Sequence, residues 1–120
     1  MIPDPAAIQA LLPLPAATFH ILLAVSDGDR HGYAIIQDIA ARTNGTLRMS
    51  AGTLYRSIAR MVEQDLITET TRRHTREEDE RRRYYRITAF GTAVARAEMK
   101  RLSDLVRLAR ASGLTPETAS

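Results

Sequence analysis

The chain has 120 residues, 44% of them hydrophobic, which is enough for one small domain with a core of its own. It contains no cysteine, so disulfides and thiolate metal sites are excluded, and this composition suits a reducing cytoplasm. No apolar run approaches the roughly 20 residues that span a bilayer, and residues 1–5 lack a secretory signal pattern. These features predict a cytoplasmic protein that does not interact with membranes.

The net charge of +3 is concentrated in one segment of the chain. Residues 72–86 contain seven arginines and four acidic residues, and this surplus equals the net charge of the whole protein. Sixteen of the 17 basic residues are arginine, whose planar guanidinium forms paired hydrogen bonds with phosphate and with guanine. The segment therefore indicates a nucleic-acid partner, while a solvated charged loop is the simpler alternative.

Helical signals divide the first part of the chain into three segments. The Asp-Pro pair at residues 4–5 is typical of a helix start, and two nearby prolines end this short helix. A second helix, predicted over residues 15–25, is apolar on all sides and is therefore expected at the centre of the core. A third is predicted over residues 32–43, with His31 capping or orienting its start, while Asn44 and the following glycine end it.

Ser50 caps a predicted fourth helix of about four turns. Its apolar residues Leu54, Ile58 and Met61 recur at helical spacing, and Val62 widens this stripe. The remaining face is polar and carries Thr53, Arg56, Ser57 and Arg60. Two helices joined by a few residues, the second with a polar face, form a helix-turn-helix.

Two strands are predicted to follow, over residues 66–72 and 83–88, with a long charged segment between them. In the second strand, Tyr85 and Ile87 lie on one face and alternate with residues of the other face. A helix-turn-helix followed at once by a charged hairpin is the arrangement of a winged helix-turn-helix. The predicted fold is therefore mainly α with a small β-hairpin.

A last helix, capped by Thr88, is predicted over residues 89–111 and would be about 35 Å long. Such a helix projects beyond a domain of this size, and its far apolar stripe needs a partner. The stripe consists of Met99, Leu102, Leu105, Val106 and Ala109. The economical partner is a second copy of the chain, so a homodimer is expected. The predicted organisation is an N-terminal arm (1–13), a winged helix-turn-helix DNA-binding domain (14–88), a dimerisation helix (89–112) and a flexible tail (113–120).

The polar face of the fourth helix has the chemistry needed to bind duplex DNA. The helix N-terminus carries unpaired amides that attract phosphate, and Gly52 permits close approach of the backbone. Arg56 and Arg60 lie one turn apart, where they could reach base edges in a major groove. Ser50, Thr53 and Tyr55 add hydroxyl donors near this end of the helix, and Ser57 lies on the same polar face. Contacts to the flanking backbone or the minor groove are expected from hairpin arginines, including Arg72, Arg73, Arg81 and Arg82. For Tyr55, packing beside the apolar stripe is an equal alternative, and the two helix arginines could instead be ordinary solvated residues.

Several short motifs together resemble the PadR family of bacterial transcriptional regulators, over about residues 14–111. They are His31-Gly32-Tyr33 at the start of the third helix, Ser50-Ala51-Gly52-Thr53-Leu54-Tyr55 at the start of the fourth, Leu66-Ile67 and Arg82-Arg83-Tyr84-Tyr85-Arg86-Ile87-Thr88 in the hairpin, and Gly91. The resemblance implies a winged helix-turn-helix repressor that acts as a homodimer through its C-terminal helices. It also implies that Tyr33 lies near DNA.

The resemblance further implies that the N-terminal helix packs on the partner subunit, which would bring Ile8, Leu11 and Leu12 into the interface. Some members of the family bind aromatic or drug-like effectors between the subunits. Here such a cavity would be lined by Ile8, Leu12, Met99 and Val106, and a closed apolar interface is the alternative. The chain departs from the family at Ala51 and Arg56, where proline is common, and at Asp65, where glycine is common. Arg56 makes the operator preference harder to transfer.

The sequence therefore predicts a sequence-specific transcriptional regulator, a repressor that binds double-stranded DNA at a pseudo-palindromic operator as a homodimer. Relief by a small aromatic effector is an additional hypothesis. The alternative is a winged-helix protein-interaction module without DNA binding, which would expose apolar or acidic residues on the recognition face. No catalytic residue, metal or cofactor is predicted, because no catalytic triad, metal-ligand cluster or phosphate loop is evident and the three histidines lie far apart.

Overall fold

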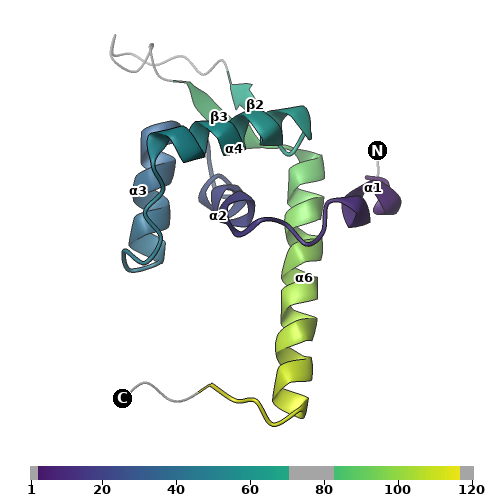
Figure 1. Cartoon of the computed structure of the whole chain (residues 1–120). Coiled ribbons are helices and arrows are strands. Elements are labelled where there is room, and N and C mark those ends of the chain that lie inside the picture. Colours follow the sequence, from purple (N-terminus) through teal and green to yellow (C-terminus); the bar gives the residue numbers. More distant parts are fainter. Residues whose placement is uncertain (1–2, 71–82, 117–120) are drawn as a thin grey trace.

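The computed structural model describes residues 3–70 and 83–116, and these residues form five helices and three short strands (Figure 1). In chain order the elements are α1 (Pro5–Ala10), α2 (Ala16–Ala24), β1 (Arg30–His31), α3 (Gly32–Arg42), α4 (Ala51–Glu63), β2 (Ile67–Thr70), β3 (Tyr84–Ile87) and α6 (Ala89–Ala111). The predicted winged helix-turn-helix, mainly α with a small hairpin and a long last helix, is confirmed.

Three helices begin where their capping residues predicted. Asp4 caps α1, Ser50 caps α4 and Thr88 caps α6, and each side-chain oxygen accepts a hydrogen bond of 2.8–3.2 Å from a backbone N–H. At the end of α3, Asn44 and Gly45 take the left-handed conformation that the sequence predicted, with φ of 51° and 78°. These boundaries follow from local chemistry, which is why they could be read from the sequence.

The core surrounds α2, as its all-round apolar character predicted. Ile21 and Leu22 are fully buried, and α2 packs against α3, α4 and α6. The stripe of α4 is also buried, but Val62 is 42% exposed, so the prediction that it widens the stripe is wrong. Val62 follows the fully buried Met61 by one position, which turns it about 100° towards a flank of α4.

The sheet has three strands in the order β1-β3-β2, all antiparallel, so β3 is central. The hairpin of β2 and β3 was predicted, whereas β1 was not. Arg30 pairs with Tyr85, and His31 pairs with Tyr84, whose ring lies edge-on to the imidazole at 5.4 Å between centroids. The Nδ1 atom of His31 also accepts a hydrogen bond of 3.1 Å from the N–H of Ala34, so His31 caps α3 as expected. One residue therefore connects the stem of the wing to the start of α3.

A tight corner joins the wing to α6. Asp65 has φ of 61°, in line with its place where the family often has glycine. The hydroxyl of Thr88 donates to the carbonyl oxygens of Asp65 (2.6 Å) and Leu66 (3.1 Å). A Cβ atom at Gly91 would collide with the carbonyl oxygen of Leu66, so the glycine is required by this close approach.

A buried carboxylate holds the link between α1 and α2 against α6. Glu98 is only 2% exposed, and its Oε2 atom accepts a hydrogen bond of 3.0 Å from the N–H of Leu14. Its Oε1 atom accepts one of 2.5 Å from Nε of Arg101. The hydrogen bond from Arg101 lowers the pKa of Glu98 more than burial raises it, and the Leu14 N–H lowers it further. Glu98 therefore stays ionised while it fixes the N-terminal arm.

The second half of α6 extends away from the rest of the molecule (Figure 1). The buried residues of α6 end at Glu98. The radius of gyration is 16.3 Å, compared with about 14 Å for a compact domain of this length. Among the described helices, none combines the length and the apolar character that crossing a membrane requires.

Candidate nucleic-acid interface

A short chain of hydrogen bonds covers the exposed start of α4. Oγ of Ser50 accepts from the N–H of Thr53 at 3.2 Å and donates to Oγ1 of Thr53 at 3.0 Å. Nη2 of Arg56 donates to the same Oγ1 atom at 3.4 Å. Arg56 lies about 200° around the helix from the buried Leu54, so it points away from the core. The cap of α4 therefore also orients an exposed guanidinium.

Gly52 lies in the first turn of α4, and no contact with the described residues explains why it is glycine. A Cβ atom built there would meet no described atom within 4 Å. Glycine inside a helix also costs about 0.5–1 kcal/mol relative to alanine. The described residues therefore do not require glycine at this position, and the close approach of an external backbone there stays a prediction.

A groove lies between the start of α2 and the polar face of α4. It has a volume of about 220 Å³ and is lined by Pro15, Ala17, Thr18, Thr53, Arg56, Ser57 and Arg60. No acidic residue lines it, and neither arginine forms an ion pair with any residue in 3–70 or 83–116. The sequence placed Arg56, Ser57 and Arg60 on this face but did not associate α2 with it.

Two tyrosines border the other flank of α4. Tyr33, in the first turn of α3, is 61% exposed. Tyr55 is 49% exposed, yet its ring lies over Gly32, where a Cβ atom would come within 2.8 Å of Cζ. Of the two interpretations of Tyr55, packing is therefore observed, and half of the residue stays accessible.

The wing arginines contribute less free charge than the sequence suggested. Arg86 forms a two-fold hydrogen bond with Asp29, Nε to Oδ1 at 3.0 Å and Nη2 to Oδ2 at 2.9 Å. Arg83 lies 3.7 Å from Glu69. Two of the seven arginines counted in the surplus therefore have acidic partners within the fold. The four hairpin residues predicted to contact DNA, Arg72, Arg73, Arg81 and Arg82, lie outside the described residues.

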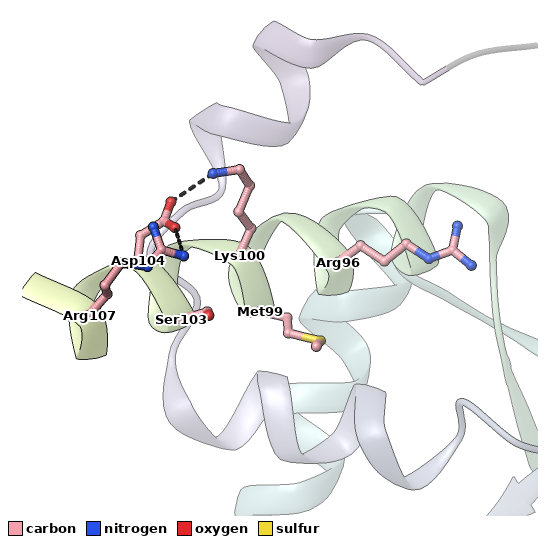
Figure 2. Close-up of a pocket in the computed structure, with 6 residues that line it drawn as sticks. All are labelled: Arg96, Met99, Lys100, Ser103, Asp104 and Arg107. Atoms are coloured by element: carbon pink, nitrogen blue, oxygen red, sulfur yellow. Dashed lines mark hydrogen bonds and ion pairs between the residues drawn. The ribbon is translucent and has the colours of Figure 1, made fainter.

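The outer half of α6 presents an apolar stripe beside a polar row. Figure 2 shows Met99 next to this row, in which Asp104 pairs with Lys100 at 2.7 Å and with Arg107 at 3.3 Å. The hydrogen bond from Lys100 is the main cause that lowers the pKa of Asp104. Of the predicted dimerisation residues on α6, Met99, Leu105 and Val106 are more than half exposed, whereas Leu102 and Ala109 are partly buried. Ile8, Leu11 and Leu12 pack partly against the core of their own chain.

An apolar hollow of about 260 Å³ lies between α2, β3 and α6, lined by Phe19, Leu23, Ser26, Ile87, Thr92, Ala95, Arg96 and Met99. Of the four residues predicted to line an effector cavity, only Met99 is among them. Phe19 and Leu23 were missed because α2 is apolar on every side, so its sequence cannot tell which side is left open. Within residues 3–70 and 83–116, no three His, Asp or Glu side chains are grouped so that they could hold a metal ion.

Comparison with known proteins identifies the family. The model of the transcriptional regulator PadR-like family matches residues 21–97. This chain belongs to the PadR-like family. An uncharacterized protein of Lysinibacillus sphaericus is 33% identical in an alignment 91 residues long, which covers 71% of this chain and 82% of that protein.

Two solved structures share the PadR-like fold. A transcriptional regulator from Clostridium thermocellum has a TM-score of 0.66 at 23% identity, over 91% of this chain and 96% of its own. A PadR family transcription regulator from hypervirulent Clostridium difficile has a TM-score of 0.68 at 20% identity, over 80% of this chain and 96% of its own. The resemblance predicted from the sequence is therefore confirmed.

The PadR-like motifs of this chain coincide with its structural junctions. The first contains His31, which caps α3, and Gly32, which lies under Tyr55. The last contains Thr88 and Gly91, which fix the corner between the wing and α6. The motifs therefore account for how α3, α4, the wing and α6 are held together. Arg56 and Arg60, on the outward face of α4, lie outside these motifs.

Proposed function

We propose that this PadR-like chain is a sequence-specific DNA-binding transcriptional regulator that acts as a repressor, as a homodimer, on a pseudo-palindromic operator. The observation that carries the proposal is the exposed face of α4, where Arg56 and Arg60 lie without acidic partners among the described residues. The opposite face of the same helix is locked into the core by Leu54, Ile58 and Met61.

Helix α4 has the dimensions and chemistry for the major groove of DNA. An α-helix is about 10–12 Å wide with its side chains, and the major groove is about 12 Å wide. Arg56 projects away from the core and is oriented by Thr53, which suits a paired hydrogen bond to a guanine edge. The open first turn at Gly52, the Ser50 hydroxyl and Tyr33 would then contact phosphates on either side.

The homodimer is supported by the exposed stripe on α6. Met99, Leu105 and Val106 leave more than half of their surfaces exposed, and burying each such side chain contributes about 1.5–3 kcal/mol. Two-fold symmetry would place two copies of α4 in successive major grooves, about 34 Å apart. A pseudo-palindromic operator follows from that symmetry.

A titration with DNA from the region upstream of the gene for this chain tests the proposal. Fluorescence anisotropy at several salt concentrations is expected to give an affinity at least about 10³-fold above that for an unrelated duplex. The affinity should also fall as salt rises, because bound phosphates release counterions. An affinity that responds neither to salt nor to sequence would favour the interaction module instead. The polar, basic face of α4 argues against that alternative.

Relief of repression by a small aromatic effector is supported by the apolar hollow beside Phe19, Leu23 and Met99. A thermal-shift screen with planar aromatic compounds, followed by DNA titration with any compound that stabilises the protein, tests this part. If no compound raises the unfolding temperature or changes DNA affinity, the hollow belongs to a closed apolar interface.

A further inference from the structure

We propose that the N-terminus of α2 is a phosphate-binding subsite, which takes one backbone phosphate of the duplex bound by α4. This inference rests on the proposed DNA-binding function and adds a second element to the interface. The subsite is the groove between the two helices, with the first turn of α2 on one wall and Arg60 on the other.

The first turn of α2 has unsatisfied hydrogen-bond donors. Its N-cap residue is Pro15, which forms no side-chain cap, whereas each of the other four described helices has one. The N–H of Phe19 is the first to bond within the helix, to the carbonyl oxygen of Pro15 at 3.1 Å. The amides of residues 16–18 are therefore without helical acceptors and carry the positive end of the helix dipole.

Thr18 gives an independent sign that the groove takes a ligand. Thr18 lines the groove although the residue is only 6% exposed. Its hydroxyl forms no hydrogen bond with any residue among 3–70 and 83–116. Because this hydroxyl is not fully shielded from solvent, it can reach an outside acceptor, and an oxygen of a bound phosphate would accept its hydrogen bond.

The opposite wall supplies positive charge. Arg60 and Arg56 reach the groove from α4, together with the hydroxyl of Ser57, and no carboxylate lines it. The volume of about 220 Å³ is several times the ~30 Å³ that one water molecule occupies in the liquid. Amide donors, a free hydroxyl and guanidinium groups around an open groove are the usual ligands of a phosphate.

The occupant should be a phosphodiester of DNA, because the groove continues the face of α4 that would enter the major groove. Thr53, whose Oγ1 atom accepts from Arg56, belongs to both surfaces. The two arginines then have different tasks. Arg56 reads a base edge, and Arg60 binds phosphate jointly with α2, although the sequence alone assigned both to base edges.

Placing a carboxylate at the second position of α2 tests the subsite. Ala17→Asp should preserve the helix, since an acidic residue in the first turn is favourable to the helix dipole. In the groove, however, it should repel phosphate. The matched control is Ala6→Asp, which makes the same change at the second position of α1, where Ala6 is exposed.

The expected result is that Ala17→Asp weakens binding to upstream and unrelated duplexes alike by about tenfold or more. It should also reduce the slope of log affinity against log salt concentration by about one for each subsite lost. Ala6→Asp should stay within about twofold of the wild type. Thr18→Val, nearly the same in volume, should weaken both duplexes about fivefold by removing one hydrogen bond.

Equal affinities for Ala17→Asp, Thr18→Val and the control would overturn the subsite, while binding by the wild type would still support the proposed function. No binding by the wild type would overturn both. Inorganic phosphate provides the last arm. If it raises the unfolding temperature of the wild type, but neither variant changes DNA affinity, the groove binds a free anion and the DNA assignment is wrong.

Discussion

Two glycines of this chain, twenty residues apart, have opposite surroundings. Gly32 lies under the ring of Tyr55, so any side chain there would displace the tyrosine. Gly52 faces open space, so the fold would tolerate a side chain. One glycine therefore serves packing within the chain, and the other leaves room for something outside it.

Replacing these glycines by alanine should separate stability from DNA affinity. Gly52→Ala is expected to raise the free energy of unfolding by about 0.5–1 kcal/mol, because glycine is costly inside a helix, while it weakens DNA binding. Gly32→Ala should lower the free energy of unfolding by about 1–3 kcal/mol through overpacking. Denaturant unfolding and DNA titration measure the two effects. Unchanged DNA affinity for Gly52→Ala would show that no backbone approaches there.

Glu98 should give the protein an acid-sensitive component of stability. Its pKa is lower in the folded chain than its usual value of 4.5, so the folded state holds this proton less tightly than the unfolded state. The stabilisation is complete above the unfolded pKa and is lost as pH falls through the folded pKa. Unfolding curves from pH 7 to pH 3 should show this loss.

Glu98→Gln removes that component and provides the comparison. It should lower the free energy of unfolding at pH 7 by about 1–2 kcal/mol, a modest value because Arg101 remains partly exposed. Below the folded pKa, wild type and variant should converge. Parallel curves for the two proteins would mean that Glu98 does not carry the acid sensitivity.

At the scale of elements, the features that depend on neighbouring residues could be predicted from the sequence. Those that depend on contacts between distant residues could not. The caps Ser50 and Thr88 act within three residues, and both were predicted. Strand β1 has only two residues, too few for any alternation to show, and it forms by pairing with β3 more than fifty positions later. The ion pair of Arg86 with Asp29 spans a similar distance, so the sequence counted Arg86 as free charge.

The same limit applies to the candidate site. Residues on the polar face of α4 followed from helical periodicity, because that face is defined within one element. The contribution of α2 depends on how two helices cross, and no pattern within either helix encodes it. In the sequence, Thr18 looks like one more residue of an apolar helix, and only its place in a groove that Arg60 also lines led to the proposed role.

The stripe on α6 should decide the oligomeric state. Leu105→Glu is expected to convert a dimer into a monomer at micromolar concentration, because a carboxylate would be buried without a partner. Light scattering coupled to size-exclusion chromatography measures the mass. The control is Ala111→Glu, two residues beyond Ala109 and so about 200° around the helix from the stripe. A dimeric Leu105→Glu variant would exclude this stripe as the interface.

For the whole molecule, the affinity for any DNA duplex and the specificity for the operator sequence should be separable by mutation. Arg56→Ala is expected to cost about 1–3 kcal/mol on the operator and much less on an unrelated duplex, because it removes a base contact. Arg82→Ala, in the hairpin outside the described residues, should weaken both duplexes equally and lower the salt slope. Titrations on both duplexes at several salt concentrations measure this. The reverse pattern would exchange the two roles.

The corner at Gly91 has a consequence for operator geometry. Because α6 starts against the carbonyl oxygen of Leu66, the helix leaves the winged helix-turn-helix in one fixed direction. Each residue inserted between Gly91 and Met99 would advance the stripe by about 1.5 Å and turn it by about 100°. Two extra residues would turn the two winged helix-turn-helix units of the proposed dimer out of phase with the double helix, and four would nearly restore the phase. In the proposed dimer, the length of this segment would therefore set the spacing of the operator half-sites, as a rotational register shared by protein and DNA.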